Sequence, residues 1–272
     1  MLYIQKIIAN WNSLWIIRGN LSRKTYLLLA FVGFVLPIAA WWLLSISGLV
    51  EKVFMPGPLD VLARTLTWFN DESLMGDIWI STYRVFAGFA LSAILAIPLG
   101  VMIGTYPPMK AMFEPLMDFI RYMPAVAFIP LVMLWVGIEE SSKIAIIFIG
   151  TFFQMVLMVA EDIRRVPINQ IEAAHTMGAN SGEIVSLVII QSAKPALLDT
   201  LRVTMGWAWT YLVVAELVAA NSGLGYSILR AQRFMQTDKI FAGIILIGLI
   251  GLAIDQLFRL LHRKSFPWLY LK

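Results

Sequence analysis

Residues 81–104 read STYRVFAGFALSAILAIPLGVMIG, a run of 24 positions in which Arg84 is the single charged residue. About 20 consecutive, mostly apolar residues are enough for a helix to cross the hydrocarbon core of a bilayer. The rest of the 272-residue chain has the same character, with 60% hydrophobic and 14% charged residues. In an average soluble domain, about 45–50% of the residues are apolar and about 25% are charged. One soluble core cannot hide such an excess, so the apolar residues must face lipid.

Six segments are expected to span the membrane, which makes the chain an all-α membrane protein. They are residues 25–49, 81–104, 114–137, 143–161, 195–219 and 240–261. The third segment contains Pro124 and Pro130, which interrupt the hydrogen-bond ladder of a helix. Broken helices are tolerated at membrane depth where protein or water covers their carbonyls. This segment therefore either lines a pathway or carries a simple packing kink.

The N-terminal residues 1–24 are expected to form an amphipathic helix in the membrane interface, separate from a transmembrane permease domain of residues 25–272. Apolar residues recur there at helical spacing: Ile4, Ile7, Ile8, Trp11, Leu14 and Trp15. Polar residues fill the other face, which is typical of a helix that lies in the bilayer surface. A frayed tail is the alternative. The segment has no long apolar core and is not expected to be a cleavable signal peptide.

The distribution of Lys and Arg predicts the orientation. With the six spans above, the segments and adjoining span ends on the side of the termini carry twelve of these residues, and those on the opposite side carry six. Lys and Arg are enriched on the cytoplasmic side of membrane proteins. We therefore expect a multi-pass protein with both termini in the cytoplasm.

Several kinds of chemistry are excluded by composition and motif. The chain has no cysteine and two distant histidines, His175 and His262, so neither a disulfide nor a cysteine- or histidine-based metal site is expected. It lacks the Gly-x-x-x-x-Gly-Lys-Ser/Thr loop that binds nucleotide phosphates, as well as His-Glu-x-x-His and Gly-x-Ser-x-Gly. We therefore expect neither an enzyme nor a cofactor in this chain.

The connection of residues 162–194 is too polar to span the membrane and is expected on the cytoplasmic side. Pro167 suits the first turn of a helix, and Gly178 suits the left-handed position that closes one. A second short helix is expected after Asn180-Ser181. Two short helices joined by a glycine turn form a small rigid knob that is suited to transmitting a push. An ordinary amphipathic loop that rests on the bilayer is the alternative.

The same connection resembles the EAA motif of ABC-importer permeases. Glu172, Ala173 and Ala174 match the motif's core, and Gly178 follows four residues after Ala174. Other segments resemble the family in the same order along the chain: Met55-Pro56-Gly57-Pro58, Pro115-Leu116, Arg121, Pro124, Ala127, Pro130-Leu131, Trp135-Val136-Gly137-Ile138, Ala215-Glu216-Leu217 and Gly223-Leu224-Gly225. These matches together point to the branch that imports nitrate, taurine, alkanesulfonates or bicarbonate.

The resemblance implies a type I ABC-importer permease fold with a cytoplasmic coupling helix. Glu172, Ala173, Ala174 and Gly178 would form the contact with the ATPase. The implied partners are two ATP-binding subunits, which would bind ATP and Mg²⁺, a second copy of the permease and an extracytoplasmic substrate-binding protein. The implied location is the bacterial cytoplasmic (inner) membrane. No nucleic acid is expected as a partner.

Charged residues within the spans are candidates for a substrate pathway, because ions at membrane depth usually face a cavity or a partner. Arg84 and Arg121 offer planar guanidinium groups suited to small oxyanions, and Glu216 lies near the outer end of its span. Structural pairing is the alternative, since Glu216 is a possible partner for either arginine. Asp118 also stands three residues before Arg121, and Asp199 stands three before Arg202.

Two further candidates for the pathway are Pro124, at the break in the third segment, and Trp209. Trp209 belongs with Trp207 and Tyr211 to an aromatic group in residues 195–219, where it would form either a gate or an interfacial anchor. A secondary transporter or channel for a small anion is the competing function. It would need its own ion-coupling site and usually internal symmetry, and no internal repeat is evident.

Overall fold

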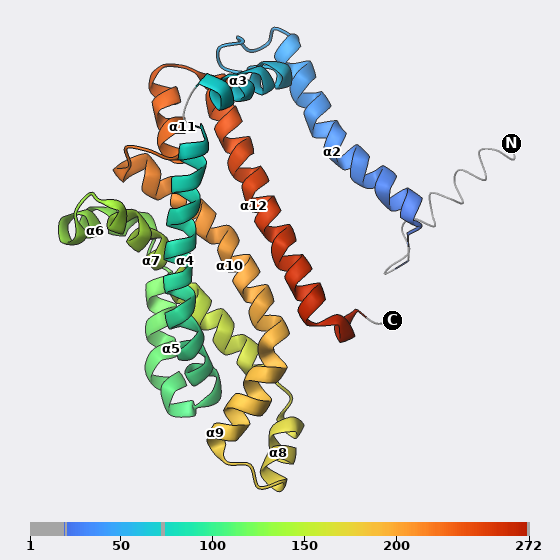
Figure 1. Ribbon diagram of the computed structural model, residues 1–272, viewed down its shortest axis with the longest axis vertical. Helices are drawn as coiled ribbons and strands as arrows, with labels where there is room; N and C mark the ends of the chain where they lie inside the picture. Colours follow the sequence, from blue (N-terminus) through green and yellow to red (C-terminus); the bar gives the residue numbers. More distant parts are fainter. Residues whose placement is uncertain (1–18, 20, 72–73, 271–272) are drawn as a thin grey trace, which may run out of the picture. The chain divides into compact units, whose positions relative to one another are not determined.

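The computed structural model describes residue 19, residues 21–71 and residues 74–270. Most of the predicted interfacial helix lies outside these residues. The described residues form helices and no strands (Figure 1). The helices are α2 (Arg23–Ile46), α3 (Pro58–Asp71), α4 (Leu74–Thr105), α5 (Pro107–Arg121), η1 (Ala125–Phe128), α6 (Ile129–Val136), α7 (Glu140–Arg164), α8 (Ile168–Thr176), α9 (Ser181–Glu183), η2 (Ile184–Ile189), α10 (Ile190–Ala219), α11 (Leu224–Arg233), α12 (Thr237–Ser265) and η3 (Pro267–Leu269).

The chain divides into two compact units, with the boundary between Leu62 and Ala63. In the first unit, α2 is long and apolar enough to cross a membrane. The end of α2 holds the irregular segment of turns and bends that follows it. The indole Nε1 of Trp41 donates to the carbonyl of Pro56 at 3.0 Å, and Ser45 Oγ donates to the carbonyl of Met55 at 3.2 Å. The proline-rich segment is thereby fixed against the helix rather than left as a free loop.

The second unit is built on α4, α7 and α10: α7 packs against both of the others, and α4 and α10 also touch each other. Small residues of α4 make the closest approach possible. A Cβ placed on Gly88 would lie 2.7 Å from Ile147, one on Gly100 would lie 2.6 Å from Val159, and one on Gly104 would lie 2.7 Å from Ile163. Glycines at such contacts let two helix backbones meet, which is a common way of packing helices in membranes.

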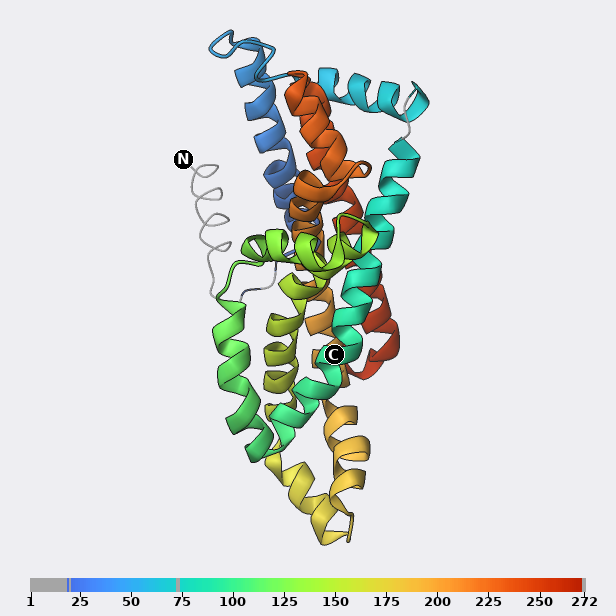
Figure 2. The same cartoon turned by 90° about the vertical axis from the view of Figure 1, so that its left-hand side faces the viewer.

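Five helices, or six spans if a bent pair counts as one, are long and apolar enough to cross a membrane among the described residues. The predicted third span is the bent pair. The break expected in residues 114–137 is present, since α5 and the η1–α6 piece meet at 88°. Pro124 has an extended backbone and starts η1, while Pro130 lies in the first turn of α6. Figure 2 shows α6 lying across the direction of α4.

The expected second short helix of the cytoplasmic knob is not a separate helix. α9 continues through η2, which is a π-helical stretch, directly into α10. Residues Ser181–Val218 therefore form one 38-residue helical segment. The helix begins at Ser181, as expected from Asn180-Ser181, but it does not end before α10. Figure 1 places α8 and α9 at one end of the second unit and α11 at the opposite end.

Candidate functional site

Three regions contain the residues that the sequence singles out, and the first is the turn between α8 and α9. Pro167 precedes α8, and Gly178 ends it with φ +86°. The amide of Gly178 donates to the carbonyl of His175, and the next amide donates to the carbonyl of Ala174. Because only glycine adopts this φ without a Cβ penalty, Gly178 sets the direction in which the chain leaves α8.

The other side of this turn is closed by a capping box. The amide of Asn180 donates to Glu183 Oε2 at 2.8 Å, and the amide of Glu183 donates to Asn180 Oδ1 at 3.0 Å. Reciprocal capping of this kind satisfies two backbone donors at the start of a helix. The turn is therefore fixed at both ends, and it presents exposed side chains, including Met177 at 83% exposure.

α8 is joined firmly to the spans behind it. Ala174 is 4% exposed and packs in the core shared by α4, α7 and α10. Ser192 Oγ of α10 donates to Gln170 Oε1 of α8 at 2.8 Å. Glu172 and Ala173 lie on the exposed side of α8. Of the four predicted coupling residues, three therefore lie on the surface and one anchors the helix.

The second region is a buried ionic cluster at the α11 end of α4. Arg84 and Glu216 have fully buried side chains, and Arg84 Nη1 lies 2.6 Å from Glu216 Oε1. The same guanidinium contacts Glu140 at 2.6 Å and 2.7 Å and donates to the carbonyl of Ser222 at 2.7 Å. Buried ions of this kind are normally paired, because a single charge in a low-dielectric interior is very costly.

The cluster also captures the start of α11. Consecutive backbone amides of Gly223, Leu224 and Gly225 donate to Asp77, Ser81 and Glu216 at 2.9, 2.9 and 2.7 Å. The first amides of a helix have no partner within the helix, and negative groups there are favourable. Four elements, α4, α7, α10 and α11, are therefore tied together at one point. This arrangement is a scaffold that fixes the loop before α11.

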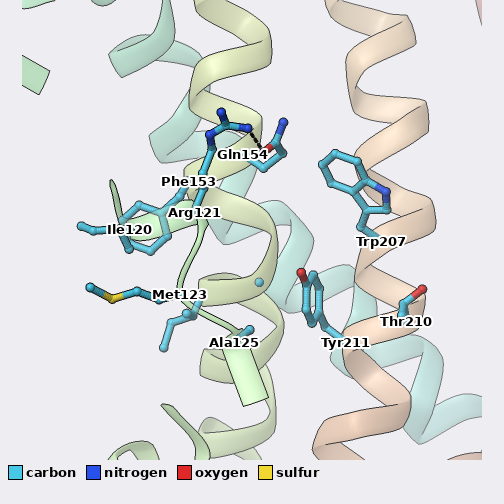
Figure 3. Close-up of a pocket in the computed structure, with 11 residues that line it drawn as sticks. Ile120, Arg121, Met123, Ala125, Phe153, Gln154, Trp207, Thr210 and Tyr211 are labelled. Carbon is cyan, nitrogen blue, oxygen red and sulfur yellow. Dashed lines mark hydrogen bonds between the residues drawn. The ribbon is translucent and has the colours of Figure 1, made fainter. Parts of the chain in front are cut away.

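The third region is a cavity of about 310 Å³ between η1, α7 and α10 and the end of α5 (Figure 3). Its lining is Ile120, Arg121, Met123, Ala125, Ile149, Gly150, Phe153, Gln154, Trp207, Thr210 and Tyr211. Arg121 is the one charged member of this lining. Aromatic and apolar surfaces therefore surround a single guanidinium with a few neutral polar groups, a composition typical of small-molecule sites.

Arg121 is held in place by three neighbours. Its Nε donates to Asp118 at 2.9 Å, its Nη2 donates to the hydroxyl of Tyr122 at 3.0 Å, and its Nη1 lies 3.5 Å from Gln154 Oε1. Its side chain remains 30% exposed. Because a guanidinium has five N–H donors, donors remain for an anionic group in the cavity.

The five candidate pathway residues are not brought together. Arg121 lines the cavity, and Pro124 stands between two residues that line it. Arg84 and Glu216 belong to the ionic cluster. Trp209 is 4% exposed and packs in the core, whereas Trp207 and Tyr211 line the cavity.

The lining residues of α7 and α10 that are not among the five candidate pathway residues recur at helical spacing. On α10, Trp207, Thr210 and Tyr211 stand at i, i+3 and i+4 and share one face of the helix. On α7, Gly150, Phe153 and Gln154 have the same spacing. Trp209 stands two positions after Trp207 and therefore points to the other side of α10. The spacing thus favours Trp207 over Trp209.

Among residue 19, residues 21–71 and residues 74–270, no group of three or more His, Cys, Asp or Glu side chains could hold a metal ion. Asp199 and Asp255 pair with Arg202 at 3.1 and 3.3 Å.

Comparison with known proteins identifies related chains. Residues 96–266 match the family described as "Binding-protein-dependent transport system inner membrane component". A probable ABC transporter permease of Brucella melitensis is 38% identical over 247 residues, covering 91% of this chain and 99% of the relative. A putative aliphatic sulfonates transport permease of Bacillus subtilis is 34% identical, covering 93% and 92%. The taurine transport system permease of Escherichia coli is 31% identical, covering 92% of both chains.

Solved structures agree on the fold. A chain of the MetNI methionine ABC transporter, solved in inward-facing conformations, superposes with a TM-score of 0.58 at 22% identity. The superposition covers 73% of this chain and 95% of that chain. At this level of identity the similarity concerns the arrangement of helices alone.

Proposed function

Because the chain belongs to the binding-protein-dependent transport system inner membrane components and is an ABC transporter permease, we propose that it is the membrane-spanning subunit of an ATP-driven importer of a small anion. Relatives named for taurine and for aliphatic sulfonates support a substrate that carries a negatively charged sulfonate group. Nitrate and bicarbonate are the other two candidates. An extracytoplasmic binding protein delivers the substrate.

The observation that carries this proposal is that the knob and the cavity share two helices. α8 follows α7 and is hydrogen-bonded to α10 through Gln170 and Ser192. α7 and α10 also supply most of the cavity lining, including Gln154 and Tyr211. A movement of the knob is therefore passed to the cavity walls through two continuous helices. Coupling of this type needs an element with two arrangements that each ligand biases differently.

The proposed coupling surface consists of Glu172, Ala173 and Gly178, with Met177 at its tip, and the buried Ala174 anchors it to the bundle. The exposed carboxylate of Glu172 and the small side chain of Ala173 suit close contact with another protein. Two ATP-binding subunits, which bind ATP and Mg²⁺, would dock here. Closure of the ATP-binding pair would push the knobs of two permease copies and open the pathway toward the binding protein.

The proposed pathway passes the Arg121 cavity. Arg121 supplies positive charge and free donors, Pro124 breaks the helix beside it, and the aromatic residues of α10 form the opposite wall. Arg84 and Glu216 act on this pathway indirectly, by fixing the α11 end of the same bundle. In the proposed orientation, the knob and both termini face the cytoplasm, and the membrane is the bacterial cytoplasmic membrane.

Uptake into proteoliposomes tests the proposal. The vesicles contain this chain, its ATPase partner and the cognate binding protein, with ATP on the ATPase side. Labelled nitrate, bicarbonate, taurine and a short alkanesulfonate are supplied separately. ATP-dependent accumulation of one of them is expected. Accumulation that persists without ATP while an ion gradient is maintained would instead indicate a secondary transporter.

A further inference from the structure

The ring of Tyr211 lies directly on the backbone of Gly150. A Cβ built on Gly150 would overlap the Cγ, Cδ2 and Cε2 atoms of that ring. Gly150 belongs to α7 and Tyr211 to α10, and both line the Arg121 cavity (Figure 3). The aromatic side chain therefore occupies the space that any other residue at position 150 would fill.

This contact differs from the other close glycine contacts of the bundle. Gly88, Gly100 and Gly104 of α4 meet the aliphatic side chains of α7 in the packed interface between those helices. Gly150 instead meets an aromatic ring, and both Gly150 and this ring line the cavity. The position of the ring, and with it the depth of the cavity, depends on the absence of a side chain at residue 150.

We propose that Tyr211, seated on Gly150, is a specificity-determining residue that limits the length of the anion the cavity accepts. This inference rests on the proposed function. The charged head of the substrate lies at Arg121, and its body lies against the aromatic wall of Tyr211 and Trp207. The substrate is therefore an organic anion with a short apolar body, such as an alkanesulfonate, rather than a bare inorganic oxyanion.

This limit on length follows from the close packing of protein interiors, which leaves no space for an added methyl group. Non-bonded carbon atoms rest about 3.5–4.0 Å apart, so a methyl group at residue 150 forces the ring away from α7. Displaced from α7, the ring moves into the cavity. In an apolar pocket, one methylene of misfit changes discrimination roughly 10- to 200-fold. A Gly150→Ala variant should therefore reject the longer members of a homologous series.

The test measures ATP-dependent uptake of methanesulfonate, butanesulfonate and hexanesulfonate in the proteoliposomes described above. Gly150→Ala is expected to lower the ratio of hexanesulfonate to methanesulfonate uptake roughly tenfold or more. Tyr211→Ala, which removes the ring, is expected to raise that ratio. The double variant should have an uptake ratio close to that of Tyr211→Ala, because no ring remains to be displaced. Gly206→Ala on α10 is the control, since a Cβ there meets nothing within 4 Å.

A length profile unchanged in both Gly150→Ala and Tyr211→Ala would overturn the inference. If Gly150→Ala fails to assemble, an unchanged profile in Tyr211→Ala alone overturns it, and a profile shifted to longer anions supports it. Accumulation of only nitrate or bicarbonate by the unmodified chain would also overturn it while leaving the proposed function intact. Failure of the unmodified chain to accumulate any anion would count against the proposed function itself.

Discussion

At the scale of single residues, Gly178 gives the sharpest test of coupling. Its φ of +86° is unfavourable for any side chain, although a Cβ there would meet no atom within 4 Å. Gly178→Val therefore acts through backbone strain alone, which costs about 1–2 kcal/mol. We expect the variant to assemble and hydrolyse ATP, while the substrate taken up per ATP falls roughly 5- to 30-fold.

Two further variants distinguish backbone strain at Gly178 from a general sensitivity of this turn to substitution. Gly178→Asn should lose less coupling than Gly178→Val, since Asn tolerates the left-handed conformation. Gly182→Ala, four residues along and without a positive φ, should transport normally. Normal coupled uptake by Gly178→Val would contradict the proposed role of the turn.

Arg84 and Glu216 lead to a prediction about stability. Removing one partner of a buried ion pair leaves an uncompensated charge and costs about 3–5 kcal/mol. Arg84→Met should therefore lower the unfolding midpoint of the detergent-solubilised protein in a denaturant titration. Arg84→Met combined with Glu216→Leu should recover part of the loss. A single variant as stable as the unmodified chain would show that the cluster does not hold the bundle together.

Arg121 has a different role and should respond differently. Its side chain is partly exposed in the cavity, so Arg121→Gln should leave the unfolding midpoint nearly unchanged. A hydrogen bond to a charged group contributes about 1.5–3 kcal/mol, so the KM for uptake should rise roughly tenfold or more. Arg121→Lys keeps the charge but loses the planar guanidinium, so its KM should lie between those of the unmodified chain and Arg121→Gln. Unchanged uptake kinetics in Arg121→Gln would remove Arg121 from the pathway.

The sequence indicated which residues carry charge at membrane depth but not which way each one points. Arg84 and Arg121 look equivalent as isolated arginines within apolar segments. The structure separates them because Glu140 and Glu216, which lie 56 and 132 residues from Arg84, converge on it. Such long-range pairing depends on how helices rotate against each other, which local spacing does not encode. Within one helix, local spacing was informative, as Trp207 and Tyr211 demonstrate.

At the scale of helices, the interface between α4 and α7 depends on small residues. A Cβ on Gly100 would lie 2.6 Å from Val159 and 2.8 Å from the carbonyl of Val156. Overpacking of this kind typically costs about 1–3 kcal/mol, so Gly100→Ala should lower the unfolding midpoint. Gly248→Ala on α12, where a Cβ meets nothing within 4 Å, should leave it unchanged or raise it. Equal midpoints for the two variants would contradict close packing at Gly100.

The sequence composition predicted which segments are apolar helices. It predicted less well where one helix breaks and where another continues. Pro124 and Pro130 marked the break in the third segment but not its angle, which is 88°, nor the packing of α6 against α7 and α10. A second short helix was expected after Asn180-Ser181, and a helix does begin at Ser181. It is not short, because it continues through η2 into α10. Capping residues indicate where a helix starts but not where it ends.

At the scale of the second unit, the knob and the loop before α11 lie at opposite ends of the same helices (Figure 1). The proposed mechanism requires these ends to face opposite sides of the membrane, with the knob in the cytoplasm. The chain has no cysteine, so single cysteines can report this without background. Met177 at the knob and Phe234 after α11 are 83% and 65% exposed and suit labelling.

A membrane-impermeant maleimide should label Phe234→Cys in intact spheroplasts and Met177→Cys only in inverted membrane vesicles. Val156→Cys, at a fully buried position, should react in neither preparation. Adding the ATPase subunit to the inverted vesicles should then protect Met177→Cys, because docking covers the tip of the knob. Labelling of Met177→Cys in intact spheroplasts would reverse the orientation. Labelling that persists with the ATPase bound would move the docking surface away from α8, since a covered thiolate cannot reach the reagent.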